Sequence, residues 1–317
     1  MSGIPLLNVS SFEIARDNFA ILFAVATPAE RFGFAALIGL IIGSFLSVVV
    51  YRLPLMLQRA WERELHLSKP STDPVGTPPA ADNGKPTPRP TPLRFNLCVP
   101  GSSCTECGHP ILIWENIPVL SYVLLRGRCS ACRTPIGFIY PLIEILSALL
   151  AALMLWRFGL SWQTLCGFGL GASLLALGFI DLRTQLLPDA ITLPLLWAGL
   201  LVNLGYVFTT PESAILGAAA GYVTLWLVYW IFKLVSGKEG IGYGDFKLFA
   251  ALGAWLGWQA LPMILLVAAI AGAVVGIGAI VLGRIKREEP LPFGPFLAAS
   301  ALLMLLGNFS IESWLGY

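Results

Sequence analysis

Charged side chains are scarce in this chain of 317 residues. Only 12% of the residues are charged and 56% are hydrophobic, whereas a soluble globular chain carries about a quarter charged residues. This scarcity excludes an ordinary soluble domain and predicts an all-α polytopic membrane protein in contact with membrane lipid. The net charge of +2 indicates no particular partner, and we expect no nucleic acid among the partners.

Three other features are missing. No internal period of roughly 20 to 50 residues is evident, so the chain lacks the related halves typical of many ion-coupled transporters. No Gly-rich cofactor fingerprint of the soluble type is visible. A signal peptide is not expected at residues 19–29, because this segment is apolar but short, and Arg16 before it is offset by Glu13 and Asp17. We expect residues 1–33 to form an N-terminal segment with an interfacial helix.

Long apolar runs are abundant instead. Residues 34–53 predict a first transmembrane helix, and a transmembrane domain is expected at 137–317. The runs of that domain cover residues 137–156, 162–180, 186–208, 213–232, 246–258, 260–282 and 291–307. A spanning helix needs about 20 apolar residues, so the run 246–258 is short enough to be re-entrant. The sequence therefore predicts seven or eight crossings.

The positions of Lys and Arg favour about eight crossings. Cytoplasmic loops carry an excess of these residues. With the long polar segment in the cytoplasm and eight crossings, only Arg16, Arg31 and Arg157 lie outside. With seven crossings, the basic cluster at 284–287 moves outside as well. The eight-span arrangement also brings the inner ends of the runs 162–180 and 213–232 to the cytoplasmic face.

Residues 54–136 form the only long polar segment and are expected to be a cytoplasmic domain. Its part 68–92 predicts a disordered or polyproline-like linker. The prolines of this linker are Pro70, Pro74, Pro78, Pro79, Pro86, Pro88, Pro90 and Pro92. After it, residues 94–136 are expected to form a small folded unit.

Four cysteines in that unit have the spacing of a metal site. Cys104 and Cys107 form one CxxC pair, Cys129 and Cys132 form another, and residues 108–128 separate the pairs. Two such pairs supply four thiolates for a tetrahedral zinc ion, which would be structural because no coordination position stays open. Disulfides are not expected in the reducing cytosol. A redox function is the alternative, but it lacks a surrounding βαβ pattern.

The other cysteines and the nearby histidine are expected to have lesser parts. Cys98 and His109 lie close in sequence to the four cysteines and fit neighbours better than ligands. Cys166 lies within an apolar run and fits a packing residue.

Two aspartates lie where apolar runs end. Asp181 closes the run 162–180, and Asp245 follows Gly242 and Gly244 after the run 213–232. Carboxylates next to the membrane are costly and mark functional candidates. If two such carboxylates face each other they share a proton, so that one activates water while the other protonates a carbonyl oxygen or leaving amine. This is the chemistry of an aspartic protease. The glycines predict a flexible turn that presents Asp245 at the start of a helix.

Other acidic residues offer alternatives. Asp189 is a rival partner for Asp245, although it also fits the N-cap of a helix over 190–208. Asp181 itself could pair with Arg183 or cap a helix. Glu144 lies inside the run 137–156 and is expected to make a polar contact with another helix, or to line a site.

Taken together, the chain resembles the bifunctional type IV prepilin peptidases, which are membrane aspartic proteases of the GxGD type. The resemblance rests on motifs spread over most of the chain. These motifs are Gly43-Ser44-Phe45-Leu46, Arg52-Leu53-Pro54, the two CxxC pairs, Asn116-Ile117-Pro118, Tyr140-Pro141-Leu142-Ile143-Glu144, Ile180-Asp181-Leu182, Leu187-Pro188-Asp189, Gly242-Tyr243-Gly244-Asp245-Phe246-Lys247 and Pro292-Phe293-Gly294-Pro295-Phe296.

The resemblance implies a function. It assigns catalysis to Asp181 and Asp245 at the cytoplasmic face of the bacterial inner membrane. The implied substrates are prepilins and pseudopilins, cut after the glycine that ends a short basic leader. It also implies that S-adenosylmethionine then methylates the new N-terminal amine, an activity associated with the N-terminal cytoplasmic region. The chain departs from the family at Ser47, where many relatives have Asn, and in its longer Pro-rich insert. Both departures bear on methylation and not on cleavage.

Two functions of other classes stay open at the level of the residues. An ion- or proton-coupled transporter would use the two aspartates as ion ligands near the middle of the membrane. A zinc-anchored assembly factor would use the four cysteines and perform no chemistry.

Overall fold

The computed structural model describes residues 27–68, 95–99, 101–237, 242–284 and 291–307. Helices dominate these ranges, and the only strand-like pairings within them are two isolated bridges, Ser103 with Pro110 and Arg128 with Pro135. The expected interfacial helix at 19–29 and the expected linker at 68–92 lie almost entirely outside the described residues.

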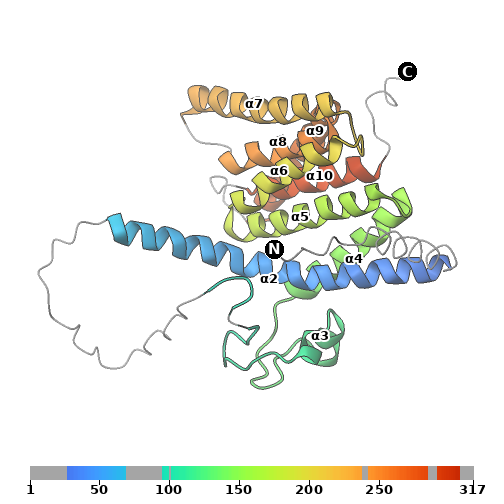
Figure 1. Ribbon diagram of the computed structural model, residues 1–317. Helices are drawn as coiled ribbons and strands as arrows, with labels where there is room; N and C mark the ends of the chain where they lie inside the picture. The colour runs from blue at the N-terminus through green and yellow to red at the C-terminus, as the bar shows by residue number, and fades with distance from the viewer. Residues whose placement is uncertain (1–26, 69–94, 100, 238–241, 285–290, 308–317) are drawn as a thin grey trace, which may run out of the picture.

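The main helices lie side by side in one bundle (Figure 1). They are α2 (Pro28–Ser68), α4 (Ile139–Phe158), α5 (Trp162–Thr184), α6 (Asp189–Asn203), α7 (Pro211–Ser236), α8 (Tyr243–Leu256), α9 (Leu261–Val281) and α10 (Gly294–Leu306). Three shorter elements connect them: η1 (Ile113–Asn116), α3 (Leu120–Leu124) and η2 (Trp258–Ala260). Residues 95–136, with η1 and α3, form a small unit beside α2 and α4, and we call it the cysteine unit.

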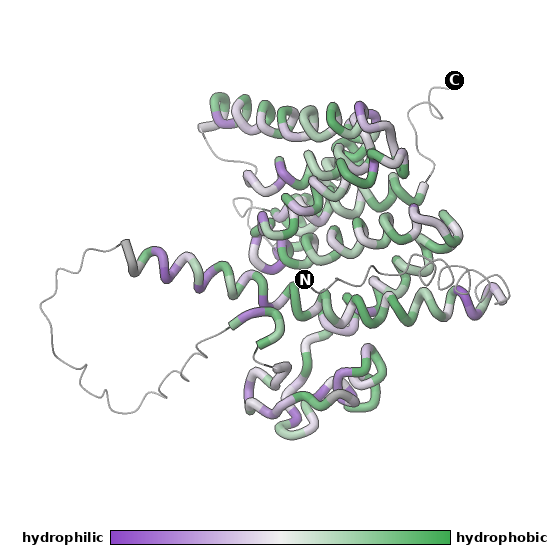
Figure 2. The backbone as a smooth tube through the Cα atoms, viewed as in Figure 1, coloured by the Kyte–Doolittle hydropathy of each residue, from purple (hydrophilic) through white to green (hydrophobic). Residues whose placement is uncertain are grey.

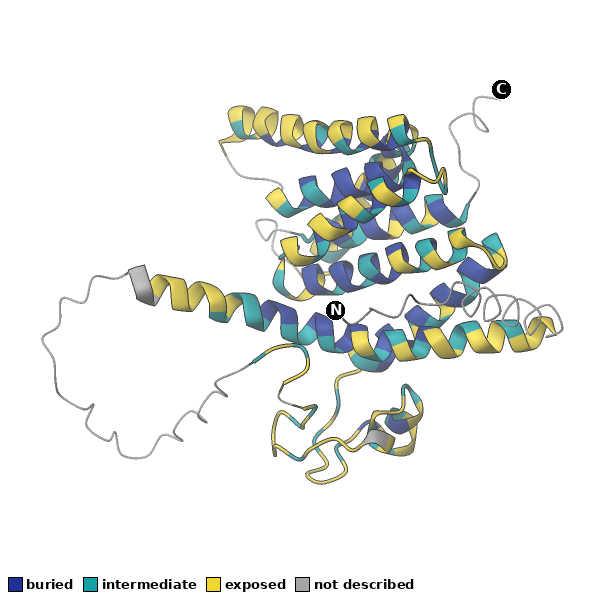
Figure 3. Ribbon diagram, in the orientation of Figure 1, coloured by how far each residue is buried: buried dark blue, intermediate teal, exposed yellow. Residues whose placement is uncertain are grey.

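Five helical stretches of the described chain are long and apolar enough to cross a membrane. They are the α2 stretch Pro28–Leu65, α4, α5, α7 and the stretch Trp258–Val281 that contains α9. Their outward faces carry large exposed hydrophobic side chains such as Leu234 and Val281 (Figure 3). Such a surface suits lipid and not water. The expected class, an all-α polytopic membrane protein, is confirmed. Helices α6, α8 and α10 have only 13 to 15 residues, so the expected total of about eight crossings stays a prediction.

Small residues let neighbouring helices approach closely. A Cβ built on Gly39 of α2 would lie 2.5 Å from the Cα of Ala148 in α4, and one built on Gly43 would lie 2.7 Å from the Cα of Glu144. Helices in lipid associate through such close backbone contacts, because apolar side chains gain little by leaving lipid. The glycines at these positions are therefore required to hold α2 against α4.

Helix α8 lies inside the bundle and is held at its C-terminal end. Its residues 248–255 are all buried (Figure 3). Asn203 Nδ2 donates to the carbonyl oxygens of Ala254 at 2.8 Å and of Trp255 at 2.9 Å, which satisfies acceptors that a helix end leaves open. The indole of Trp255 donates to the Leu195 carbonyl at 2.8 Å. These bonds fix α8 against α6, and the position of Asp245 at the opposite end of α8 follows from them.

Helix α2 continues as one helix through Pro54 to Ser68, well past the end of its apolar run. The extension projects away from the bundle and is more polar than the rest of α2 (Figures 1 and 2). Near its base, Arg52 donates to the carbonyl oxygens of Asn96, Leu97 and Gly101 at 3.2 to 3.4 Å. The guanidinium of Arg59 lies 4.0 Å from the centroid of the Phe95 ring. Helix α2 therefore carries the first residues of the cysteine unit.

Candidate active site and metal centre

Asp181 lies in the last turn of α5 and is 5% exposed. Its Oδ2 accepts a hydrogen bond of 3.0 Å from the backbone N–H of Gly294, the first residue of α10. Amides at a helix N-terminus have no partner within the helix, and they favour a nearby negative charge. A Cβ built on Gly294 would lie only 2.7 Å from the same oxygen. The close approach of this carboxylate therefore depends on a glycine at position 294.

Asp245 lies in the first turn of α8, as expected from the sequence, and is 7% exposed. Its Oδ1 is buried and has no hydrogen-bond partner among the described residues. The negative charge of Asp181 is close enough to act electrostatically on Asp245. A buried oxygen without a partner is costly in a folded protein. Its position beside a second buried carboxylate suits an oxygen that binds water or substrate.

Leu187 connects the two aspartate segments. A Cβ built on Gly294 would lie 3.2 Å from Leu187 Cδ2, and one built on Gly244 would lie 2.7 Å from Leu187 Cβ. The loop after α5, the start of α8 and the start of α10 therefore meet around one side chain. Neither Leu187 nor Gly294 was singled out from the sequence as a site residue. The only sequence signal for these two residues is that each belongs to a motif shared with the family that the chain resembles.

The two glycines of the motif differ in what they do. Gly244 is needed because Leu187 packs directly against it. Gly242 has φ −76° and ψ 146° as the N-cap of α8, which is a conformation open to any residue. Its hypothetical Cβ would lie 3.5 Å from Asp245 Oδ2, an ordinary contact.

The expected role of Asp189 as an N-cap is wrong. Pro188 occupies the N-cap of α6, and Asp189 is the first residue of the helix, without a side-chain cap. Its carboxylate is instead paired with Lys247 Nζ, at 2.7 Å from Oδ1 and 2.6 Å from Oδ2. The carboxylate is therefore held by a lysine, whereas no ion pair is found for Asp181 or Asp245 in the described part of the chain. Arg183, the alternative partner of Asp181, lies with its guanidinium 5.5 Å from the centroid of the Tyr51 ring.

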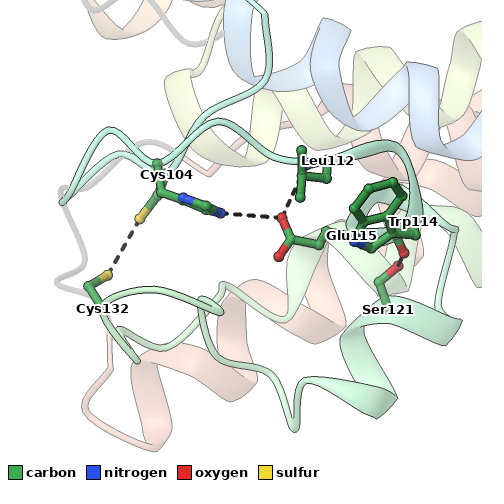
Figure 4. A network of polar contacts seen from close by, with 7 residues as sticks. Cys104, Leu112, Trp114, Glu115, Ser121 and Cys132 are labelled. Atoms are coloured by element: carbon green, nitrogen blue, oxygen red, sulfur yellow. Dashed lines mark hydrogen bonds and ion pairs between the residues drawn. The ribbon is translucent and has the colours of Figure 1, made fainter.

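The four cysteines of the two CxxC pairs come together. Their sulfur atoms all lie within 4.8 Å of one another, and Cys104 Sγ and Cys132 Sγ are 3.8 Å apart (Figure 4). Tetrahedral coordination at a Zn–S distance of about 2.3 Å separates sulfurs by about 3.8 Å. The donor set and its spacing therefore fit a structural zinc ion.

Both CxxC pairs sit on the same kind of turn. The N–H of Cys104 donates to the carbonyl of His109, and the N–H of Cys129 donates to that of Thr134, each at 2.9 Å. Four residues after the first cysteine, Gly108 has φ 75° and Arg133 has φ 63°. Residues other than glycine rarely adopt positive φ, so the turn that begins at Cys129 holds Arg133 in a conformation that costs some energy. The repeated geometry supports a single shared ion.

Glu115 connects the two turns. Its Oε2 accepts from the Leu112 N–H at 3.0 Å and lies 3.5 Å from His109 Nε2 (Figure 4). Hydrogen bonds from Ser130 and Leu112 lower the pKa of Glu115 from its ordinary value. His109 is therefore a neighbour of the metal site, and Cys98 is exposed and outside the sulfur cluster. Cys166 packs against the core of the bundle.

Glu144 lies in the second turn of α4 and is 8% exposed. Its Oε2 accepts a hydrogen bond of 2.7 Å from the N–H of Val119 in the cysteine unit, and the Ser44 side chain of α2 also contacts the carboxylate. Glu144 therefore makes polar contacts with a neighbouring helix, as expected, and also with the cysteine unit. The hydrogen bond from Val119 holds the cysteine unit against the bundle.

Comparison with known proteins gives a consistent answer over most of the chain. Residues 37–158 match the bacterial Peptidase A24 N-terminal domain, and residues 168–277 match the type IV leader peptidase family. The first segment contains the four cysteines and Glu144, and the second contains both aspartates. No solved structure was found to match the chain.

Several relatives carry the name prepilin leader peptidase/N-methyltransferase. One from Burkholderia pseudomallei is 52% identical over 305 residues, which are 96% of this chain and 94% of the relative. One from Pseudomonas putida is 49% identical over 90% of this chain and 93% of its own length. One from Pseudomonas aeruginosa is 46% identical over 85% and 88%. These matches do not support a transporter. The chain belongs to the type IV leader peptidase family, together with its bacterial N-terminal domain.

Proposed function

We propose that this protein removes the leader peptide from type IV prepilins and pseudopilins and then methylates the new N-terminal amine. The observation that carries the first activity is the pair of buried aspartates, Asp181 and Asp245, drawn from two helices whose site ends meet around Leu187. The names of the relatives support both activities. Cleavage after the glycine of a short basic leader follows from the family resemblance.

The two carboxylates act as one acid–base unit. Close carboxylates do not both ionise readily, so the pair holds a single proton. The ionised member takes a proton from water, which attacks the peptide carbonyl carbon, and the protonated member donates to the carbonyl oxygen or the leaving amine. The Gly294 N–H holds one oxygen of Asp181 in place. The pH dependence of cleavage belongs to the pair and not to either residue.

The site is at the cytoplasmic face of the bacterial inner membrane in this proposal. Asp181 ends the inward-running helix α5, and Asp245 begins α8, which follows the next inward-running helix, α7. Eight crossings therefore place both aspartates at the same face. The flanking positive charges support that orientation. The cysteine unit then lies in the cytoplasm, where four thiolates hold one structural zinc ion.

S-adenosylmethionine is the methyl donor that the proposed second activity needs. When bound, it supplies a methyl group to the amine nitrogen, the carbon–sulfur bond breaks with its electron pair staying on sulfur, and the nitrogen releases a proton to water. The protein must bind this donor near the cytoplasmic end of the bundle, within reach of the newly formed N-terminus.

Substitution of each aspartate tests the peptidase. Purified Asp181→Asn and Asp245→Asn proteins should cleave a prepilin at least about a hundredfold more slowly, because each removes one half of the acid–base pair. The matched control is Asp189→Asn, whose partly exposed ion pair with Lys247 contributes at most about 1 kcal/mol. Product mass reports cleavage and methylation in the same reaction. Cleavage at the normal rate by both aspartate variants would refute the assignment.

A further inference from the structure

A cavity of about 450 Å³ lies between α2, the start of α4 and the cysteine unit. Its size falls in the range of about 300 to 1,000 Å³ that is typical of small-molecule sites. Its walls come from all three parts of the fold, including Tyr51 and Arg52 of α2, Tyr140 and Glu144 of α4, and Glu115 and Val119 of the cysteine unit. The proposed cleavage chemistry uses none of these side chains.

Among the described residues around the cavity, Glu144 has no cationic partner. The guanidinium of Arg52 donates hydrogen bonds to three backbone carbonyl oxygens, and His109 is paired with Glu115. Neither of these basic side chains is therefore paired with Glu144. Glu144 is buried, and its described contacts are the uncharged Val119 N–H and the Ser44 side chain. A buried carboxylate without a cation is costly. The cavity is therefore suited to a ligand that brings positive charge.

The backbone near Glu144 is also unusual. Val119 has φ 59°, a conformation that is rare for a β-branched residue. Its N–H is the group that donates to Glu144. Strained backbone of this kind persists where the surrounding structure holds it, often beside ligands.

The cavity wall also contains two aromatic side chains. Tyr51 and Tyr140 both line the cavity, and the guanidinium of Arg183 lies over the ring of Tyr51. Arg183 is two residues beyond Asp181 in α5. An aromatic wall offers stacking for a flat base and a favourable surface for a cation. Arg183 therefore borders one wall of the cavity.

We propose that this cavity is the S-adenosylmethionine site, with Glu144 facing the sulfonium of the donor and Tyr51 and Tyr140 contacting its adenine. The proposal rests on the proposed methylation. S-adenosylmethionine unites a cationic sulfonium, an ammonium group and a flat purine, and the cavity offers a buried carboxylate and two aromatic rings. The product of methyl transfer, S-adenosylhomocysteine, is a neutral thioether at sulfur, so a carboxylate near the sulfur favours the substrate over the product.

Binding measurements on the full-length protein in detergent test this assignment. Affinities for S-adenosylmethionine and S-adenosylhomocysteine are measured by equilibrium binding in wild type, Glu144→Gln and the control Glu212→Gln. The amide introduced by Glu144→Gln retains an oxygen that accepts from the Val119 N–H but has no charge. We expect this variant to bind S-adenosylmethionine about tenfold more weakly and S-adenosylhomocysteine less than threefold more weakly. Substitution of Glu212, exposed in the first turn of α7, should have no effect.

A second measurement does not depend on any variant. Tritiated S-adenosylmethionine is cross-linked to the wild-type protein by ultraviolet light, and the labelled peptides are identified. Label on residues 47–52, 115–122 or 137–144 supports the cavity. Label confined to other peptides, or equal losses of affinity for both compounds in Glu144→Gln, overturns it while leaving the proposed function intact. No binding by wild type overturns both the cavity and the methylation, and the cleavage assay remains an independent test of the peptidase.

Discussion

At the residue scale, glycines decide where the catalytic carboxylates can lie. Gly294 brings a backbone N–H to within 3.0 Å of Asp181 Oδ2 and leaves no room for a Cβ. Gly244 likewise leaves no room for a Cβ against the Leu187 side chain. The geometry of two acids far apart in the chain therefore depends on residues that carry no chemistry themselves.

We predict that Gly294→Ala slows leader cleavage by about ten- to a hundredfold. The added methyl group displaces the Asp181 carboxylate, and misplacement of a catalytic group by about 1 Å has an effect of this size. Single-turnover kinetics on a prepilin substrate measure the loss. Gly169→Ala in α5 is the matched control, because a Cβ there meets nothing within 4 Å. A normal rate in Gly294→Ala would contradict the requirement.

The individual candidate residues could be identified from the sequence because their signals are local. The CxxC spacing marks the four cysteines, and a carboxylate at the end of an apolar run marks Asp181 and Asp245. The contacts between these residues and Gly294 or Leu187 join segments that are distant in sequence, and a single sequence holds no local signal for them. Asp189 was misassigned for the same reason, since its partner Lys247 lies on another helix.

At the element scale, α8 positions Asp245 because it is packed on several sides. Asn203 holds its C-terminal carbonyls, and α7 approaches it through glycines. A Cβ built on Gly217 of α7 would lie 2.3 Å from the Gly253 carbonyl oxygen, and one on Gly221 would lie 2.6 Å from that of Phe249. A helix of 14 residues is about 21 Å long, so its burial by neighbouring helices matters more than its length.

We predict that Gly217→Ala destabilises the protein by about 1 to 3 kcal/mol, the usual cost of overpacking a tight contact. Thermal unfolding in detergent, followed by circular dichroism, measures the change. Gly278→Ala in α9 serves as the control, since a Cβ there has open space and alanine favours helix by up to about 1 kcal/mol. Equal stability of both variants would contradict the close α7–α8 packing.

The sequence predicted the helices themselves better than their ends. Apolar runs located the bundle helices, because a helix that crosses the membrane must be hydrophobic along its whole length. The run of α2 ends near Tyr51, yet the helix continues to Ser68. Arg59 and the other exposed residues of this extension are compatible with either helix or loop, so composition gives no boundary there.

At the scale of the whole molecule, the described residues of the cysteine unit meet the bundle at Arg52 and Arg59 of α2 and at Glu144 of α4. We predict one zinc ion per chain. Chelation, or Cys129→Ser, should loosen the cysteine unit, increase its cleavage by added protease and impair both activities, methylation more than leader removal. Mass spectrometry of the intact protein and limited proteolysis report these changes. Pure, folded and active protein without zinc would contradict the prediction.

The length of α2 has a further consequence. Its 41 residues extend for about 60 Å, roughly twice the thickness of the hydrocarbon core of a bilayer. When the lipid becomes thinner or thicker, the apolar part of α2 adapts by changing its tilt, and the polar extension changes direction with it. The tilt carries Arg52 and the attached cysteine unit with it, whereas the aspartates belong to other helices. The acyl-chain length of the host membrane is thus a variable to which methylation should respond more strongly than proteolysis.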